Sequence, residues 1–222
     1  MYSHRDTTIS IGKPLEGEWR FLRPPGHHPF AFDFVQTDSH RKRTHCKTLF
    51  HFVFHKIPSD DYYCWGKPVI SPIDGEIIRI GDGMHDHGNT SLWNTVAIWF
   101  HATFIFRPEK TDGILDIRPN AGNHLMIRSD TGYIVFLGHL KEKSICVKPG
   151  QRVKQGEQLG RIGNSGNSTA PHLHIHVVDQ IEDLLKAKVL PFVFHSYQTL
   201  TSDGEWVHRE NCVPQAGDFV RF

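Results

Sequence analysis

Three histidines repeat at every second position late in the chain, in the segment Pro171 to Val178. Successive side chains of a strand point to opposite faces, so His172, His174 and His176 would share one face. An exposed strand face normally mixes Thr, Lys and Glu rather than repeating His. Imidazole is the commonest metal ligand and the usual acid or base near neutral pH. The spacing therefore predicts a strand that has a metal-binding or catalytic face. This strand follows the Gly- and Ser-rich turn at 163–169.

A carboxylate accompanies two histidines early in the chain. Asp33 lies in the apolar run Phe30 to Val35, which follows His27 and His28. Alternation would place Asp33 on the face opposite the phenylalanines of this run. A carboxylate in an apolar strand is costly unless it is paired or bound to a cation. The run therefore predicts a strand that carries a ligand or an ion-pair partner.

The third candidate is His139, which follows Gly138 at the end of the apolar run Tyr133 to Leu137. Taken alone, a histidine at a strand end is more often structural. With the other two segments it completes a set of imidazoles and one carboxylate, which is a common ligand set for a catalytic zinc ion. Zinc lowers the pKa of bound water to about 7, so hydrolysis is the reaction that this set favours.

Short strands must position these side chains, and strand patterns dominate the sequence. Runs rich in Val, Ile and Phe are separated by turns containing Gly, Pro, Asn and Asp. Only Gln180 to Val189 has a helical pattern, and it is short. We expect an all-β fold of mainly antiparallel sheets, two-layered or sandwich-like, with one short helix. The predicted strands are Phe30–Val35, Gly75–Ile80, Thr95–Phe100, His124–Arg128, Tyr133–Leu137, Ser144–Val147 and Leu173–Val178.

The length of 222 residues fits one domain with a sizeable core. We expect a single domain over residues 1–222 with its core at about 26–178. Loop insertions are expected at about 36–63 and 81–120, where they would flank a groove. Residues 179–222 would form a C-terminal extension that closes one side. The runs expected to add strands there are Leu190–Phe194 and Gly217–Val220.

The composition excludes several classes of function. Lys and Arg number 25 against 24 Asp and Glu, so there is no net positive field to recruit nucleic acid or anionic lipid. The basic run His40 to Arg43 is interpreted as a solvated loop. No apolar stretch reaches the roughly 20 residues that span a bilayer, and the N-terminus shows no signal-peptide core. The sequence predicts a soluble protein and leaves its compartment and oligomeric state open.

The four cysteines are widely separated and form no CxxC pair, so a cysteine-ligated metal site has little support. They are expected to be free or partly buried thiols, although three pairings are conceivable in an oxidising compartment. These residues are Cys46, Cys64, Cys146 and Cys212.

Five motifs follow one another along the chain: Gly66–Ile77, Gly122–His124, Gly138–Leu140, Val147–Gly156 and Gly163–His174. In this order they resemble peptidase family M23, of the lysostaphin and LytM type. The resemblance covers about 150 residues, from Gly26 to Val178. The HxH motif after a Ser- and Gly-rich turn is its most specific part, and the Gly-x-x-Val-x-x-Gly hairpin is weaker.

The resemblance implies a LytM- and lysostaphin-like fold and a zinc-dependent endopeptidase. The zinc ligands would be a first-motif His, Asp33 and His174, and His139 and His172 would be the catalytic pair. This pair would orient the water, take its proton and stabilise the oxyanion. Members of the family cleave short peptide bridges of bacterial peptidoglycan, so the partners would be cell-wall peptides. The location would then be the cell envelope or the exterior, and the bond cleaved is open.

The first ligand departs from the family pattern, which is usually His-x-x-x-Asp. His27 and His28 lie six and five residues before Asp33. We favour His27, since related variants lengthen this turn. The pair His55 and Asp60 is an alternative that lies closer in sequence to the following motif.

Two other positions also depart from the pattern. Leu137 stands where many members carry a Tyr, which removes one expected oxyanion donor. His176 stands where Glu or Gln is frequent, and we interpret it as a residue that supports a ligand or lies at the surface.

Two rival functions stay open. The first is a catalytically inactive M23-like binding or regulatory module, which the irregular first motif favours and the retained His139 and HxH motif oppose. The second is a biotinyl- or lipoyl-type carrier, suggested by the hairpin rhythm of Val147 to Gly160. No Lys lies on an obvious modification turn, and a carrier would have no use for three aligned histidines.

Overall fold

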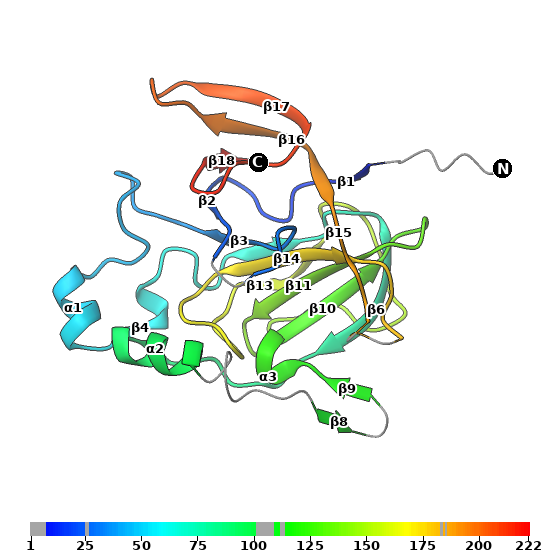
Figure 1. Cartoon of the computed structure of the whole chain (residues 1–222), viewed down its shortest axis with the longest axis horizontal. Helices are drawn as coiled ribbons and strands as arrows, with labels where there is room; N and C mark the ends of the chain where they lie inside the picture. The colour runs from blue at the N-terminus through cyan, green and yellow to red at the C-terminus, as the bar shows by residue number, and fades with distance from the viewer. Residues whose placement is uncertain (1–7, 25–26, 101–108, 112–113, 183, 185) are drawn as a thin grey trace.

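A large, mainly antiparallel sheet organises the protein, as the ribbon in Figure 1 shows. The computed structural model describes residues 8–24, 27–100, 109–111, 114–182, 184 and 186–222. Within these residues one pairing, between β1 and β16, is parallel, and the other strand pairs are antiparallel. The strand order of the main path is β1-β16-β18-β2-β3-β14-β11-β10-β6-β12, with β15 paired to β14 and β17 to β16.

The strands of the main sheet are β1 (Ile9–Ile11), β2 (Glu18–Leu22), β3 (Phe32–Val35), β6 (Gly75–Gly81), β10 (Asn123–Arg128), β11 (Ile134–Leu140), β12 (Arg152–Val153), β14 (Leu173–Val178), β15 (Val189–Leu190), β16 (Phe192–Leu200), β17 (Trp206–Cys212) and β18 (Phe219–Arg221). Three two-stranded sheets pair β5 (Pro68–Ile70) with β13 (Gln158–Arg161), β4 (Ile57–Pro58) with β7 (Asn89–Thr90), and β8 (Glu109–Thr111) with β9 (Ile114–Asp116). The helices are α1 (Leu49–Phe54), α2 (Leu92–Phe100), α3 (Arg118–Ala121) and the 3-10 turn η1 (Ser59–Asp61). The expected all-β class is confirmed.

The main core lies on one face of β10, β11 and β14. Alternate residues of β14, including Leu173 and Ile175, are fully buried there. They pack with Val69 of β5 and Leu159 of β13, so the small β5–β13 sheet covers this face as a second layer. The period-two pattern of β14 therefore sends its apolar residues into the core and its histidines to the opposite face.

The C-terminal runs add strands to the sheet, as the sequence predicts. β16 and β18 extend the edge beyond β2, and β17 forms a long hairpin with β16. Their apolar side chains, among them Phe194 and Val220, join the main core beside Trp19. No helix in the part of the chain that the structure describes is long and apolar enough to cross a membrane.

Two predicted strands are wrong. Thr95–Phe100 belongs to α2, because Ser91 caps this helix: its Oγ accepts the Asn94 N–H at 3.2 Å. Ser144–Val147 forms no strand, since the Ser144 N–H closes a turn on the Lys141 carbonyl. The apolar run Leu49–Phe54 of the first expected insertion is also helical.

The helix predicted at Gln180–Val189 is also wrong over its described residues, which form turns and then β15. Asp179 closes this segment into a loop, since its N–H donates to the Lys188 carbonyl and its carboxylate accepts the Lys188 N–H. Leu184 and Val189 then pack on Phe136 and neighbouring apolar residues of the sheet. A ten-residue helix is marginal on its own, so these contacts outweigh the helical pattern.

His124 on β10 leads to a prediction about acid stability. Its ring is 1% exposed and lies against Gly81, and burial lowers its pKa from 6.5 to about 4, with smaller effects from Arg79, Asp116 and Arg118. Below pH 6.5, His124 is therefore protonated in the unfolded chain, whereas in the folded chain it stays unprotonated until the pH approaches 4. This residue's contribution to stability is complete above that pH and is lost as the pH falls towards 4.

We expect His124→Asn to remove about 3 kcal/mol of the acid destabilisation between pH 7 and pH 4, at about 1.36 kcal/mol per pH unit. The Asn amide can still donate to the Gly122 carbonyl, as His124 Nδ1 does at 2.8 Å. The measurement is the free energy of unfolding in denaturant at both pH values. Equal pH dependence in wild type and variant would contradict a neutral, buried His124.

Candidate metal centre

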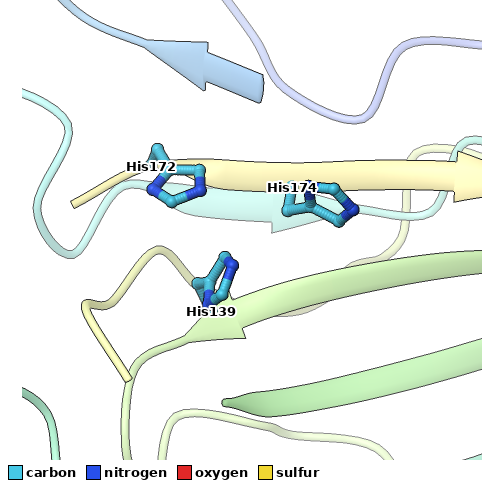
Figure 2. Close-up of side chains that lie close together, drawn as sticks. All are labelled: His139, His172 and His174. Atoms are coloured by element: carbon cyan, nitrogen blue, oxygen red, sulfur yellow. The ribbon is translucent and has the colours of Figure 1, made fainter. Parts of the chain in front are cut away.

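Three adjacent strands bring the predicted site residues together. β14 lies between β3 and β11, with His174 opposite Asp33 on one side and opposite Gly138 on the other. His139 follows Gly138 near the end of β11, so it lies one residue beyond this aligned pair. Figure 2 shows His172 and His174 from the β14 segment and His139 from β11 turned towards one space.

Asp33 is the buried carboxylate of this cluster. It is 4% exposed, its Oδ1 lies 2.8 Å from His174 Nδ1, and its Oδ2 lies 3.5 Å from His172 Nε2. Burial alone would raise the pKa of Asp33, but interactions with His172, His174 and His27 hold it well below its usual range. The carboxylate is thus kept ionised among these imidazoles.

His139 is buried and held in a defined orientation. Its backbone has φ 59°, in the left-handed region that residues other than Gly rarely adopt unless their surroundings fix them. Its Nδ1–H donates to the Ser165 carbonyl at 2.8 Å, which leaves Nε2 with a free lone pair. Burial, reinforced by His172 and His174, lowers the pKa of His139 well below 6.5, so the ring is neutral.

His172 has a matching arrangement. Its Nδ1 lies 2.8 Å from the Ala170 carbonyl, to which it donates, and its ring centroid lies 4.6 Å from that of His139. Its Nε2 is buried and has no hydrogen-bond partner among the described residues. A buried polar nitrogen without a partner is rare in a folded protein, so it indicates a missing ligand or ion.

A glycine-rich turn holds the carbonyl that orients His139. Ser165 Oγ donates to the Leu140 carbonyl and accepts the Asn123 N–H, which ties the turn to β10 and β11. Gly166 has φ 70°, and a Cβ there would lie 2.3 Å from the Gly122 nitrogen. The sequence pattern located this turn, but not the role of the Ser165 and Ala170 carbonyls, because backbone groups leave no residue-type signal.

The alternatives for the first ligand lie in different surroundings. His27 Nδ1 lies 3.7 Å from Asp33 Oδ1, and burial lowers the pKa of His27. His28 instead accepts the Phe30 N–H through Nδ1, and its ring lies 5.5 Å from the Phe30 ring between centroids. His55 and Asp60 are exposed beside α1 and in η1, outside the groups of candidate ligands among the described residues.

Two overlapping groups of ligand atoms fit a metal ion: His27, Asp33 and His174, and His139, His172 and His174. In each group the ligand atoms lie within 4.8 Å of one another. One ion with bonds of about 2 Å can join such atoms after small side-chain movements. The first group supplies two imidazoles and a carboxylate, which suits zinc and offsets its charge.

A groove of about 960 Å³ opens over the cluster. Its floor is the histidine-bearing face of the sheet, which becomes apolar at Met126, Phe136 and Val178. Thr95 of α2 and Asn120 of α3 line one wall, so the segment at 81–120 flanks the groove as expected. None of the described lining residues comes from 36–63, and α1 contacts α2, which lines the groove.

Comparisons with known proteins point to one family. Residues 112–184 match the model of peptidase family M23. The peptidoglycan DD-endopeptidases ShyA and ShyC of Vibrio cholerae are 40% and 45% identical over 60 and 53 residues, or 27% and 24% of this chain. These matched stretches span 14% and 12% of the two relatives' lengths.

Among solved structures, the catalytic domain of lysostaphin from Staphylococcus simulans aligns over 82% of this chain and 88% of its own, with 17% identity and a TM-score of 0.39. The residues matched by the family model include the HxH segment and its preceding turn. The chain is therefore similar to peptidase family M23 over residues 112–184.

Proposed function

We propose that this protein is a zinc-dependent peptidase that hydrolyses peptide bonds in bacterial peptidoglycan cross-links. Zinc would be held by His27, Asp33 and His174. The observation that carries this assignment is the Asp33 carboxylate, buried and ionised among imidazoles. A buried carboxylate is costly unless it is paired with or bound to a cation, so a metal ion is the expected partner.

His139 and His172 are proposed as the catalytic pair. Both rings donate Nδ1–H to a backbone carbonyl, so in the neutral form of each ring the lone pair lies on Nε2, the nitrogen left free of that bond. Such a nitrogen can accept a proton from the attacking water and later deliver it to the leaving amine. The protonated ring would also stabilise the negative charge that develops on the carbonyl oxygen.

When bound, zinc supplies a water whose pKa is about 7 and polarises the scissile carbonyl. The chain's own residues supply the rest. The buried His139 and the partly buried His172 would shield one side of the site from bulk water, and the groove over β11 and β14 would hold the peptide. Leu137 offers no hydroxyl, so oxyanion stabilisation would fall to the two imidazoles.

The substrate class and the location extend the same proposal. Two matched relatives are named as peptidoglycan DD-endopeptidases, which supports cell-wall peptides as substrate. Activity on this polymer would place the protein in the cell envelope or outside the cell. We further propose that residues 1–222 act as one M23-like domain, with 179–222 as an extension of its sheet.

The test measures zinc content and peptidase activity together, in wild type and His174→Ala. We expect about one zinc per chain in the wild type, loss of it in the variant, and cleavage of peptidoglycan-derived Gly or D-Ala peptides by the wild type alone. Wild-type protein that binds no zinc after resupply would contradict the proposal. It would favour the inactive binding module, for which the long spacing between His27 and Asp33 is the supporting feature.

A further inference from the structure

His176 contacts the proposed zinc ligand His174 on the side away from Asp33. The two residues lie on the same face of β14, and His176 Nδ1 is 3.0 Å from His174 Nε2. The His176 ring is stacked on Phe136 of β11, its partner in the strand register, with centroids 4.5 Å apart and planes at 19°. His174 therefore has Asp33 at one ring nitrogen and His176 at the other.

The direction of this hydrogen bond follows from the proposed function, on which the inference rests. His174 Nδ1 faces Asp33, so it is the nitrogen that would bind the ion, and a coordinating nitrogen carries no proton. The neutral His174 ring then carries its proton on Nε2. His176 Nδ1 is the acceptor that the structure places there, at hydrogen-bond distance.

We propose that His176 is a positioning residue for zinc: its Nδ1 accepts the His174 Nε2–H and so fixes the tautomer and ring orientation of that ligand. Metal-binding histidines almost always donate their other ring N–H to an acceptor, usually a carboxylate or carbonyl. An imidazole in this place is unusual, and the stacking on Phe136 explains how it is held. The planar contact fixes the plane of the His176 ring, and the contact with His174 Nε2 places the edge that carries Nδ1 towards that ligand.

Two substitutions separate the hydrogen bond from the packing. His176→Asn places an amide oxygen where Nδ1 lies and removes most of the ring. His176→Phe keeps a flat ring on Phe136 and removes the acceptor. His124→Asn is the matched control, because His124 also stacks on Phe136, at 5.5 Å, and lies in neither group of candidate ligands.

The experiment measures zinc affinity of the full chain by competition with a chelator, with the unfolding temperature of the zinc-free protein recorded for each variant. We expect His176→Phe to weaken zinc binding by about 10- to 100-fold, the usual effect of losing such a partner. The zinc affinities of His176→Asn and His124→Asn should stay within about threefold of that of wild type. Such a change is too small for the loss of a hydrogen-bond partner of a zinc ligand.

The opposite pattern, with affinity kept in His176→Phe and lost in His176→Asn, would overturn the positioning role and leave packing as the function of this ring. Unchanged affinity in both variants would overturn it as well. Wild-type protein without zinc would overturn both this inference and the proposed function. Failure of the inference alone is thus recognised by zinc binding that depends on His174 and not on His176.

Discussion

Replacing Asp33 by Asn is expected to weaken zinc binding by about 3 to 5 kcal/mol, since it removes the charged partner of a buried cation. This corresponds to a loss of roughly 10²- to 10⁴-fold in affinity. The amide has nearly the shape of the carboxylate, and it can keep a hydrogen bond to His174 Nδ1. The zinc-free variant should therefore be at least as stable as zinc-free wild type, because a buried charge has been removed.

Thermal unfolding with and without zinc makes this loss visible. At a free zinc concentration of 1,000 times Kd, the wild type should gain about 4 kcal/mol. For a chain of this size that is a rise of about 8 to 16 °C in the unfolding temperature, at roughly 2 to 4 °C per kcal/mol. Asp33→Asn should show little of this rise and no peptidase activity.

Asp60→Asn is the matched control, because Asp60 belongs to the alternative ligand pair and is exposed in η1. We expect Asp60→Asn to keep the zinc-dependent rise in unfolding temperature, and we expect the same of His55→Gln. If the rise disappears in Asp60→Asn and survives in Asp33→Asn, the ligand assignment is wrong and the compact alternative, His55 with Asp60, replaces it.

His139→Gln should lower kcat by about 10²- to 10⁴-fold while zinc content stays at about one per chain. The reduction is the usual contribution of a positioned acid or base. The metal should stay because His139 lies outside the group of His27, Asp33 and His174. The measurement combines peptide hydrolysis with metal analysis on the same sample.

This variant also decides between the two overlapping ligand groups, because His139 belongs to the other one. Zinc lost together with activity would assign His139, His172 and His174 as ligands and refute the proposed catalytic pair. His85→Gln is a suitable control: His85 is exposed and pairs with Glu142 at 2.9 Å. Its activity and zinc content should match those of wild type.

The sequence by itself determined the features that depend on local alternation. Period two in the HLHIH segment predicted which residues of β14 face the core, and the burial of Leu173 and Ile175 confirms it. The alternation of Phe and Asp likewise placed Asp33 in a strand. Strand geometry sends neighbouring side chains to opposite faces wherever the strand lies, so this information needs no tertiary contact.

Local pattern failed where long-range contacts outweighed it. The run Thr95–Phe100 is apolar and β-branched enough for a strand, yet a capped helix forms beside the groove. The run Gln180–Val189 has helical spacing, yet the Asp179–Lys188 hydrogen bonds and apolar contacts with the sheet close it into a loop. In both cases propensity is a weak term that packing and capping exceed.

Only the tertiary structure decided which residues form the site. His174 and Asp33 are 141 positions apart, and they meet because β14 pairs with β3 in one particular register. His27 also lies near Asp33, whereas His55 and Asp60 lie outside the candidate ligand groups among the described residues. Register and strand order are set by the burial of whole strand faces, which no single motif encodes. The sequence thus supplied candidate ligand types, and the packing of the sheet decided which of them lie close together.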